Sequence, residues 1–238
     1  MKPRSITVLI PTYNRPETVM KTVDLLNTNL VFDGSVRILI GDDGDEKHAV
    51  LSFPYHSRSG RWPSNVTVLD SPKRGLGSNL NFLLANAKSD VVLQMDDDHW
   101  LVESLDVNQY YDDLVYGHIG IGWIRLFLGE REDYYGNQAG YYKFTAKNVG
   151  PYWYLMPRTT ELYIPSNRPH LKLKAFHEMY GYYLEDIKLG HTEEAFCHQF
   201  EDGFMKQGSD KLWVTIPFFG LAMNQWKHVG NSWQKEGF

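Results

Sequence analysis

The first 100 residues of this 238-residue chain alternate short apolar runs with segments of helical periodicity. The apolar runs predict strands, at residues 6–10, 36–40, 66–69 and 91–95. Apolar residues three or four positions apart predict helices between them, at residues 17–26 and 76–87. Such alternation is typical of a parallel sheet covered by helices, so we expect an α/β fold. Pro11 is expected to end the first strand.

Three consecutive carboxylates, Asp96, Asp97 and Asp98, follow the fourth of these runs. Because open α/β sheets bind ligands at the carboxyl ends of their strands, polar residues after the first and second strands should lie nearby. These residues are Pro11, Thr12, Tyr13 and Asn14, and then Asp42 and Asp43. Like charges repel unless a cation lies among them, and carboxylates are the usual ligands of Mg²⁺ and Mn²⁺. The cluster therefore suggests a metal that holds a phosphate, with a solvated acidic turn as the alternative. No glycine-rich phosphate loop follows a strand.

The composition of the chain limits which partners and which location are expected. A net charge of −5 and a pI near 6.0 argue against nucleic acid as a partner. No apolar run approaches the ~20 residues of a membrane span, and no signal peptide is evident. With the single Cys197, this favours a cytoplasmic protein that is soluble or peripherally membrane-associated. Aromatic residues make up 14% of the chain and concentrate after residue 100, as expected if some of them stack on sugars.

The second half is less regular, and we expect it to complete the same compact domain. Strands are predicted in residues 117–128, 152–156, 161–164 and 212–216. Helices are predicted at residues 176–184 and 192–207, the second with Thr192 as its N-cap. The irregular residues 129–169 are expected to shape a binding site.

Several segments, in this order, resemble those of family 2 glycosyltransferases: Val8–Arg15, Ile40–Asp45, Arg74–Asn81, Met95–Asp98, Phe176–Glu185, Phe200–Phe204 and His228. The departures from the family pattern are Asp45, Leu80 and Tyr182. The resemblance implies a GT-A fold, with a mixed, mostly parallel central sheet flanked by helices. A Rossmann-like nucleotide half, residues 1–98, would be fused to an acceptor half, residues 99–225. Residues 226–238 would form a tail that could close over the donor as a lid.

The implied reaction is a metal-dependent, inverting transfer of sugar from a nucleoside-diphosphate sugar to a hydroxyl of a glycan or glycoside. The cofactor would be Mn²⁺ or Mg²⁺, and a UDP-sugar is favoured over GDP- or dTDP-sugars. The resemblance assigns the metal to Asp98, with Asp96 and His228, and gives Asp96 the ribose or a metal-bound water. Asp97, on the opposite face of the strand, would have a supporting role.

The resemblance also implies roles for residues outside the carboxylate cluster. Asp43 would bind the nucleotide base, which is flanked by Pro11, Thr12, Tyr13 and Asn14. Lys73 would approach the diphosphate, and Asn81 would belong to the same donor site. Asp202 would be the general base, with Glu201 as its competitor. We expect no role for the other histidines, His99 among them, because they lack metal-ligand spacing.

Two other functions stay open. A nucleotidyltransferase on a related sheet would normally carry a glycine- and Arg/Lys-rich loop after its first strand, where this chain has Pro11–Asn14. A non-catalytic sugar-binding module would have no need of Asp98 or Asp202. An inactive transferase is also compatible with the departures from the family pattern.

Overall fold

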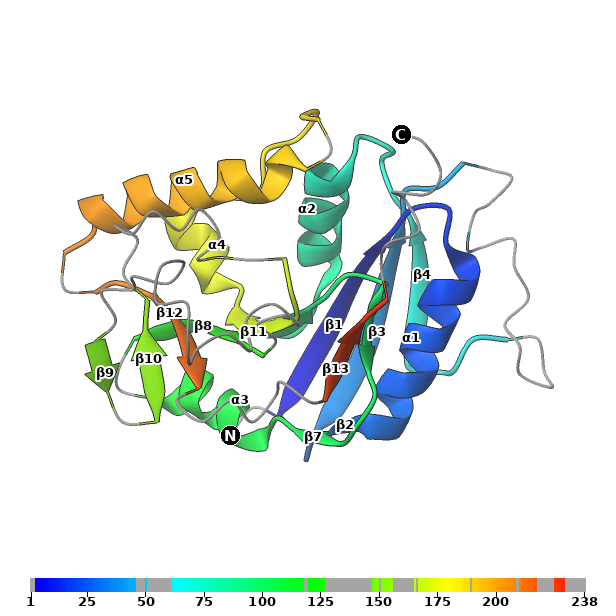
Figure 1. The fold of residues 1–238 in the computed structure, drawn as a ribbon, viewed down its shortest axis with the longest axis horizontal. Helices are drawn as coiled ribbons and strands as arrows, with labels where there is room; N and C mark the ends of the chain where they lie inside the picture. Colours follow the sequence, from blue (N-terminus) through cyan, green and yellow to red (C-terminus); the bar gives the residue numbers. More distant parts are fainter. Residues whose placement is uncertain are drawn as a thin grey trace, which may run out of the picture.

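A nine-stranded sheet forms the centre of the computed structural model (Figure 1). The structure describes residues 3–45, 50, 61–117, 120–126, 147–149, 151–155, 165, 167–188, 190–208, 210–217 and 225–229. The strand order is β4-β3-β1-β5-β11-β8-β12-β10-β9. The bounds, in that order, are Val66–Asp70, Ser35–Asp42, Ser5–Thr12, Val91–Gln94, His170–Leu173, Ile121–Arg125, Trp213–Pro217, Tyr152–Tyr154 and Lys147–Val149.

Most strands of this sheet point the same way. Strands β4, β3, β1 and β5 are mutually parallel, as are β8 and β12. Only β11 and β10 run against their neighbours within this sheet. The mixed, mostly parallel α/β sheet expected from the sequence is thus confirmed. Strand β11, which joins the two halves, was not predicted.

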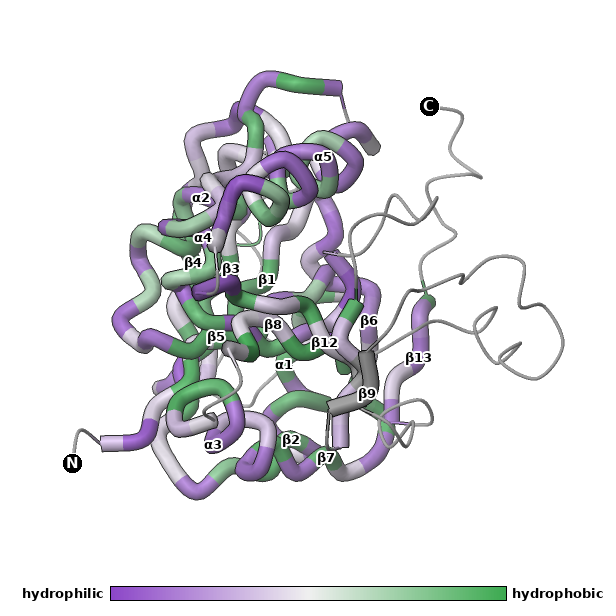
Figure 2. Tube along the Cα trace, turned by 90° about the vertical axis from the view of Figure 1, so that its left-hand side faces the viewer, coloured by the Kyte–Doolittle hydropathy of each residue, from purple (hydrophilic) through white to green (hydrophobic). Residues whose placement is uncertain are grey.

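Helices cover both faces of the sheet, as Figure 2 shows for α2 and α5 on one side and α3 on the other. Helices α1 (Pro16–Asn29) and α3 (Asn108–Tyr116) bury their apolar sides in one core. Helices α2 (Leu76–Asn86), α4 (Ala175–Tyr180) and α5 (His191–Lys206) pack in a second core on the other face. Residues of one strand alternate between these cores, as pleating requires: Val8 lies in the first and Leu9 in the second.

Two details of the expected elements were wrong. Strand β1 does not end at Pro11 but continues to Thr12. Backbone N–H groups along a strand point alternately to its two neighbours, and the nitrogen of Pro11 points toward β5. The hydrogen-bonded ladder between β1 and β5 has already ended, at the pair Leu9–Gln94. The missing N–H of proline therefore costs no ladder bond. Thr192 is not an N-cap: α5 begins at His191 after Gly190, which has φ 89°, and Thr192 is buried.

Two further differences concern the second half of the chain. Helix α4 ends at Tyr180 and does not reach residue 184, because Gly181 has a φ of 91°, outside the helical region. The strand predicted at residues 161–164 lies outside the described residues, as do most of residues 129–169.

Two small sheets tie distant segments together. Strand β2 (Leu30–Val31) pairs in parallel with β7 (Leu105–Asp106). Strand β13 (Trp226–His228) pairs antiparallel with β6 (His99–Leu101), so the C-terminal segment returns to the residues that follow the Asp cluster. None of the described helices is long and apolar enough to cross a membrane.

Candidate functional site

The three polar strand ends meet at one edge of the sheet. The backbone N–H of Asp43, after β3, donates to the carbonyl of Thr12 at 3.0 Å. The Thr12 hydroxyl in turn donates to Asp97 Oδ2, after β5, at 2.5 Å. This follows from the sheet order β3-β1-β5, because parallel neighbours present their carboxyl ends together.

A cation does lie among the carboxylates, and it is a side chain. The guanidinium of Arg15 bridges two of them, with Nη2 2.6 Å from Asp97 Oδ1 and Nη1 2.9 Å from Asp98 Oδ2. Asp97 is fully buried, and its carbonyl accepts a hydrogen bond from the Thr22 hydroxyl on α1. Asp97 therefore anchors the turn against α1 and Arg15.

The three aspartates differ in protonation. Burial raises the pKa of Asp97 to about 7, although Arg15 and the Thr12 hydroxyl oppose the shift. Burial, followed by repulsion from Asp98 and Asp97, raises the pKa of Asp96 well above its usual range. Burial acts in the same direction on Asp98, but the adjacent imidazoles of His228 and His99 and the charge of Arg15 hold its pKa well below that range. Asp98 is the permanently ionised member at neutral pH.

Two imidazoles converge on Asp98. His99 Nδ1 lies 3.3 Å from Asp98 Oδ1, and His228 Nε2 lies 3.7 Å from Oδ2. One donor atom from each of the three residues falls within 4.8 Å of the others, and the two rings are stacked with centroids 4.8 Å apart. Burial lowers the pKa of His99, which keeps its imidazole neutral. An ionised carboxylate and neutral imidazole are the forms that bind metals, so the donor set fits a divalent cation.

A sequence model described as glycosyl transferase family 2 matches residues 7–162, well over half of the chain. The chain belongs to glycosyltransferase family 2. No curated protein sequence matches the chain.

Solved structures with this fold include enzymes of low sequence identity. TarS of S. aureus (residues 1–349, with UDP-GlcNAc) matches with a TM-score of 0.53 and 16% identity, over 90% of this chain and 58% of that one. The mannosyltransferase PcManGT from Pyrobaculum calidifontis, with GDP-Man and Mn²⁺, gives 0.51 and 14%, over 84% and 52%. GalNAc-T7 with UDP, GalNAc and Mn²⁺ gives 0.58 and 14%, over 91% and 43%. The family member described here thus spans roughly half the length of these proteins, with the expected GT-A fold.

The residues predicted to bind the nucleotide lie around the ends of β1 and β3. The Tyr13 side chain is 58% exposed beside the edge formed by Pro11 and Thr12. Asn14 has a φ of 53° and accepts the N–H of Asp45 through Oδ1 at 2.9 Å. These contacts give the turn after β1 a fixed shape, next to the turn after β3.

Two other predicted residues, Asp43 and Lys73, already have protein partners. Asp43 accepts hydrogen bonds from the Ser71 hydroxyl and the Gly75 N–H, each at 3.1 Å. Lys73 donates to the carbonyl of Gly44 and pairs with Asp70 at 3.1 Å. The contacts of Asp43 and the Lys73–Gly44 bond hold the segment that leads from β4 into α2 against the turn after β3.

Asn81 joins α2 to the segment after α4. Its amide donates to the Tyr183 carbonyl at 2.9 Å and to Glu185 Oε1 at 3.0 Å, and its carbonyl accepts the Tyr183 N–H at 3.1 Å. The contacts of Asn81 indicate a structural link between these two segments.

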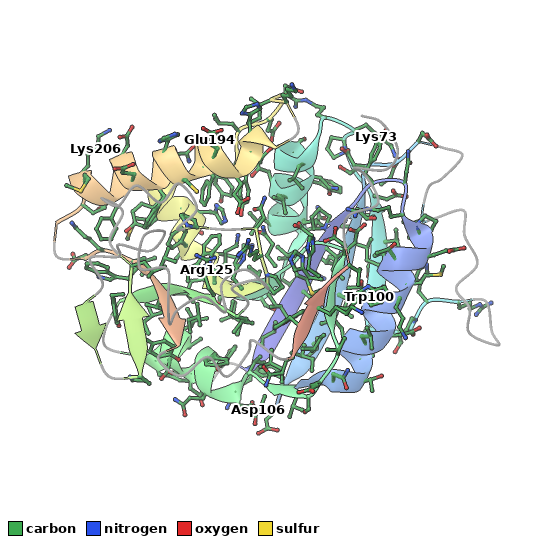
Figure 3. All side chains as sticks on the ribbon, viewed as in Figure 1. Lys73, Trp100, Asp106, Arg125, Glu194 and Lys206 are labelled. Atoms are coloured by element: carbon green, nitrogen blue, oxygen red, sulfur yellow. The ribbon has the colours of Figure 1, made fainter. Side chains whose placement is uncertain are left out.

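Asp202, the predicted base, lies in the C-terminal half of α5. Asp202 is exposed on α5, opposite the buried face of Phe196, Phe200 and Phe204, as expected. Figure 3 shows Glu194 on the part of α5 nearest α2 and Lys206 at the opposite end. At ~1.5 Å per residue, Asp202 lies roughly 13 Å along the axis from Glu193, toward the Lys206 end. Glu201 is the residue beside it.

Glu193, in the first turn of α5, lies close to the site instead. Its Oε1 accepts the backbone N–H of the buried Asn167 at 2.8 Å. Its negative charge contributes to the raised pKa of Asp96, after burial and the two neighbouring aspartates. The sequence did contain the acidic pair Glu193–Glu194 at the helix start, but it is equally typical of an ordinary first turn.

Sequence reasoning also missed Arg15 and His99. His99 directly follows the aspartates but has no second histidine at metal-ligand spacing, because its partner His228 arrives through the pairing of β13 with β6. The sequence offered no indication of that pairing. Arg15 lies within the segment Val8–Arg15 that resembles the family opening, but no role had been assigned to it.

Proposed function

We propose that this chain is a glycosyltransferase that moves a sugar from a nucleoside-diphosphate sugar to a hydroxyl of a glycan or glycoside, with inversion at the anomeric carbon. The observation that supports this best is the carboxylate and imidazole cluster at the carboxyl edge of the sheet, in a member of family 2. The nucleotide sugars bound to TarS and PcManGT support the same donor class, and UDP is the favoured nucleotide.

Asp98, His99 and His228 would hold the divalent cation, Mn²⁺ or Mg²⁺. When bound, such a cation supplies positive charge that stabilises the leaving diphosphate. PcManGT and GalNAc-T7 both bind Mn²⁺. Asp96 would orient the ribose or a water, while Asp97 supports the turn through Thr12 and Arg15.

The nucleotide would lie over the ends of β1 and β3. Asp43 is proposed to accept from the base, between the backbone of Pro11 and Thr12 and the exposed ring of Tyr13. Asn14 and Lys73 would border the donor, with Lys73 nearest the diphosphate. Because Asp43 and Lys73 already have partners, binding requires them to share or exchange hydrogen bonds.

We propose Glu193, in place of Asp202 or Glu201, as the general base. An acceptor hydroxyl has a pKa far above 7, so its proton must leave as its oxygen attacks. In that step the new carbon–oxygen bond forms, the bond to the diphosphate breaks and the proton passes to the carboxylate. The position of Glu193 in the turn of α5 nearest Asp96 supports this assignment.

Two measurements test the proposal, first nucleotide binding and then turnover. Thermal shifts would be measured with UDP, GDP and dTDP, each with and without Mn²⁺, and one nucleotide should stabilise the chain only with metal. A ligand at 100 times its Kd adds about 2.7 kcal/mol of stability. No response to any nucleotide would contradict the proposal and favour a sugar-binding module.

The matched variants Glu193→Gln and Asp202→Asn test the base. Release of the nucleotide from the corresponding nucleotide sugar would be followed with a panel of glycosides as acceptors. Glu193→Gln should retain nucleotide binding and lose about 10²–10⁴-fold in turnover, while Asp202→Asn should keep it. The reverse pattern would return the base to Asp202.

A further inference from the structure

Lys172 on β11 is fully buried beneath the site just described. Its Nζ lies 2.7 Å from Gln94 Oε1 and 3.1 Å from the Tyr183 hydroxyl, and 4.4 Å from the centre of the Trp123 ring. Among the residues that the structure describes, no carboxylate pairs with Lys172. A buried amine without a counter-ion is costly, so it calls for an explanation beyond packing.

The partners of Lys172 lead toward the active site. Gln94 is fully buried and lies two residues before Asp96. Lys172 donates to Oε1, which is the acceptor of the Gln94 amide, so the contact fixes which way this amide points. Its Nε2 then faces the Asn167 side chain, with Oδ1 at 3.4 Å, and the Tyr183 hydroxyl at 3.1 Å.

Asn167 completes the path, because its backbone N–H donates to Glu193 Oε1 at 2.8 Å. Tyr183 follows a parallel route: its backbone is held by Asn81, and its ring packs on Phe196 of α5 with centroids 4.6 Å apart. One buried polar chain thus runs from the core of the sheet to the start of α5. It consists of the Lys172 amine, the Gln94 amide, the Tyr183 hydroxyl and Asn167.

We propose that Lys172 is a positioning residue for transfer: through Gln94 and Asn167 it holds the Glu193 carboxylate in place. The inference rests on the proposed function for the role of Glu193. It assigns Lys172 no contact with substrate. Fixing a carboxylate is valuable because small misplacements of a reacting group are costly in rate.

Lys172→Met tests this, because methionine keeps the apolar stem and removes the donor. Hydrogen exchange of the Asn167 amide would be followed by NMR in the full chain, together with turnover of the nucleotide sugar selected by the titration above. Exchange at Asn167 should accelerate by about tenfold or more, since its hydrogen bond to Glu193 loosens. The kcat should fall by about 10–100-fold with little change in KM.

The matched control is Lys174→Met, two residues further along, where Nζ donates to the Ala87 carbonyl at 2.9 Å. It should change neither readout. In folded Lys172→Met, an exchange rate or a kcat equal to that of the unmodified chain would overturn the proposal. If Lys172→Met does not fold, Gln94→Leu breaks the same path, and the same two readouts decide.

The two proposals can fail separately. Full turnover by Glu193→Gln would remove the base assignment, whereas the exchange of the Asn167 amide reports on the Lys172 path without reference to chemistry. Retained exchange protection in Lys172→Met, combined with an inactive Glu193→Gln, would overturn the path and leave the base in place.

Discussion

Arg15 Nη2 lies 2.6 Å from Oδ1 of the fully buried Asp97. The pair joins the start of α1 to the turn after β5, and the second nitrogen of the same guanidinium reaches Asp98. A protein side chain thus already supplies part of the positive charge that three adjacent carboxylates require. A divalent cation at Asp98 would therefore share this carboxylate with Arg15.

The substitution Arg15→Met should destabilise the fold by roughly 3–5 kcal/mol, because it leaves the buried carboxylate of Asp97 without its charged partner. The free energy of unfolding would be measured in urea. Arg74→Met is the matched control, since Arg74 makes its ion pairs with Glu185 and Asp186 at the exposed surface, and its loss should cost much less. Equal losses in the two variants would show that the Asp97 pair contributes no more than a surface pair.

His99 should be a metal ligand alongside Asp98 and His228. The variant His99→Asn is expected to weaken Mn²⁺ binding by at least about tenfold, the lower end of the loss seen for partners that only support a ligand. Binding would be measured by titration of Mn²⁺ with EPR, without nucleotide. His198→Asn, on the exposed side of α5, should bind as the unmodified chain does. If His99→Asn binds Mn²⁺ as tightly as the unmodified chain, His99 is not a ligand and only stacks on His228.

The same donor set predicts metal preference. Two imidazoles and one carboxylate suit Mn²⁺ better than Mg²⁺, which prefers oxygen ligands and retains its waters. We expect Mg²⁺ to displace Mn²⁺ from the chain only in large excess. Competition titration checks this, and equal affinities would argue against imidazole ligation.

Lys172 should make stability depend on pH. Burial lowers its pKa well below the ordinary 10.5, and the neighbouring His170 and His177 are buried as well. The unfolded chain therefore binds a proton that the folded chain does not, so the contribution of Lys172 to stability is complete above pH 10.5 and is lost as the pH falls. Lys172→Met should be more stable than the unmodified chain at pH 7, and the difference should shrink toward pH 10.5. A difference that does not change with pH would mean that folded Lys172 stays charged.

Gly77→Ala should loosen the contact between α2 and the segment after α4. A Cβ at Gly77 would lie 2.0 Å from the backbone oxygen of Leu184, so one of the two segments must move. We expect a loss of roughly 1–3 kcal/mol, measured by thermal or urea unfolding. At Gly208 the added Cβ meets nothing within 4 Å, so Gly208→Ala should be close to neutral. A neutral Gly77→Ala would show that the two segments separate without cost.

Local sequence patterns were sufficient to predict the strands and helices in the first half of the chain. The four apolar runs and two amphipathic segments became β1, β3, β4, β5, α1 and α2, with boundaries shifted by at most three residues. The convergence of the strand ends also followed, because it depends only on parallel pairing. Strand β11 was not predicted, although His170 and Lys172 alternate with leucines as on a half-exposed strand; the structure buries both polar side chains.

The site was less accessible to sequence reasoning because its parts come from distant segments. Asp98 could be recognised from the neighbouring aspartates. His99 meets a second histidine only because β13, more than 120 residues later, pairs with β6. The choice between Glu193 and Asp202 depended on how far a helix extends from the sheet, and two acidic pairs on one helix cannot be separated by pattern alone. The roles proposed for Asp43, Lys73 and Asn81 remain predictions.

The pairing of β13 with β6 has a consequence for how this protein matures. During synthesis Asp98 and His99 leave the ribosome before His228, so a chain that has not yet reached β13 presents only two of the three proposed metal donors. The third is added when β13 pairs with β6, so assembly of the proposed site depends on that pairing. Chains in which β13 has not paired would then bind manganese poorly.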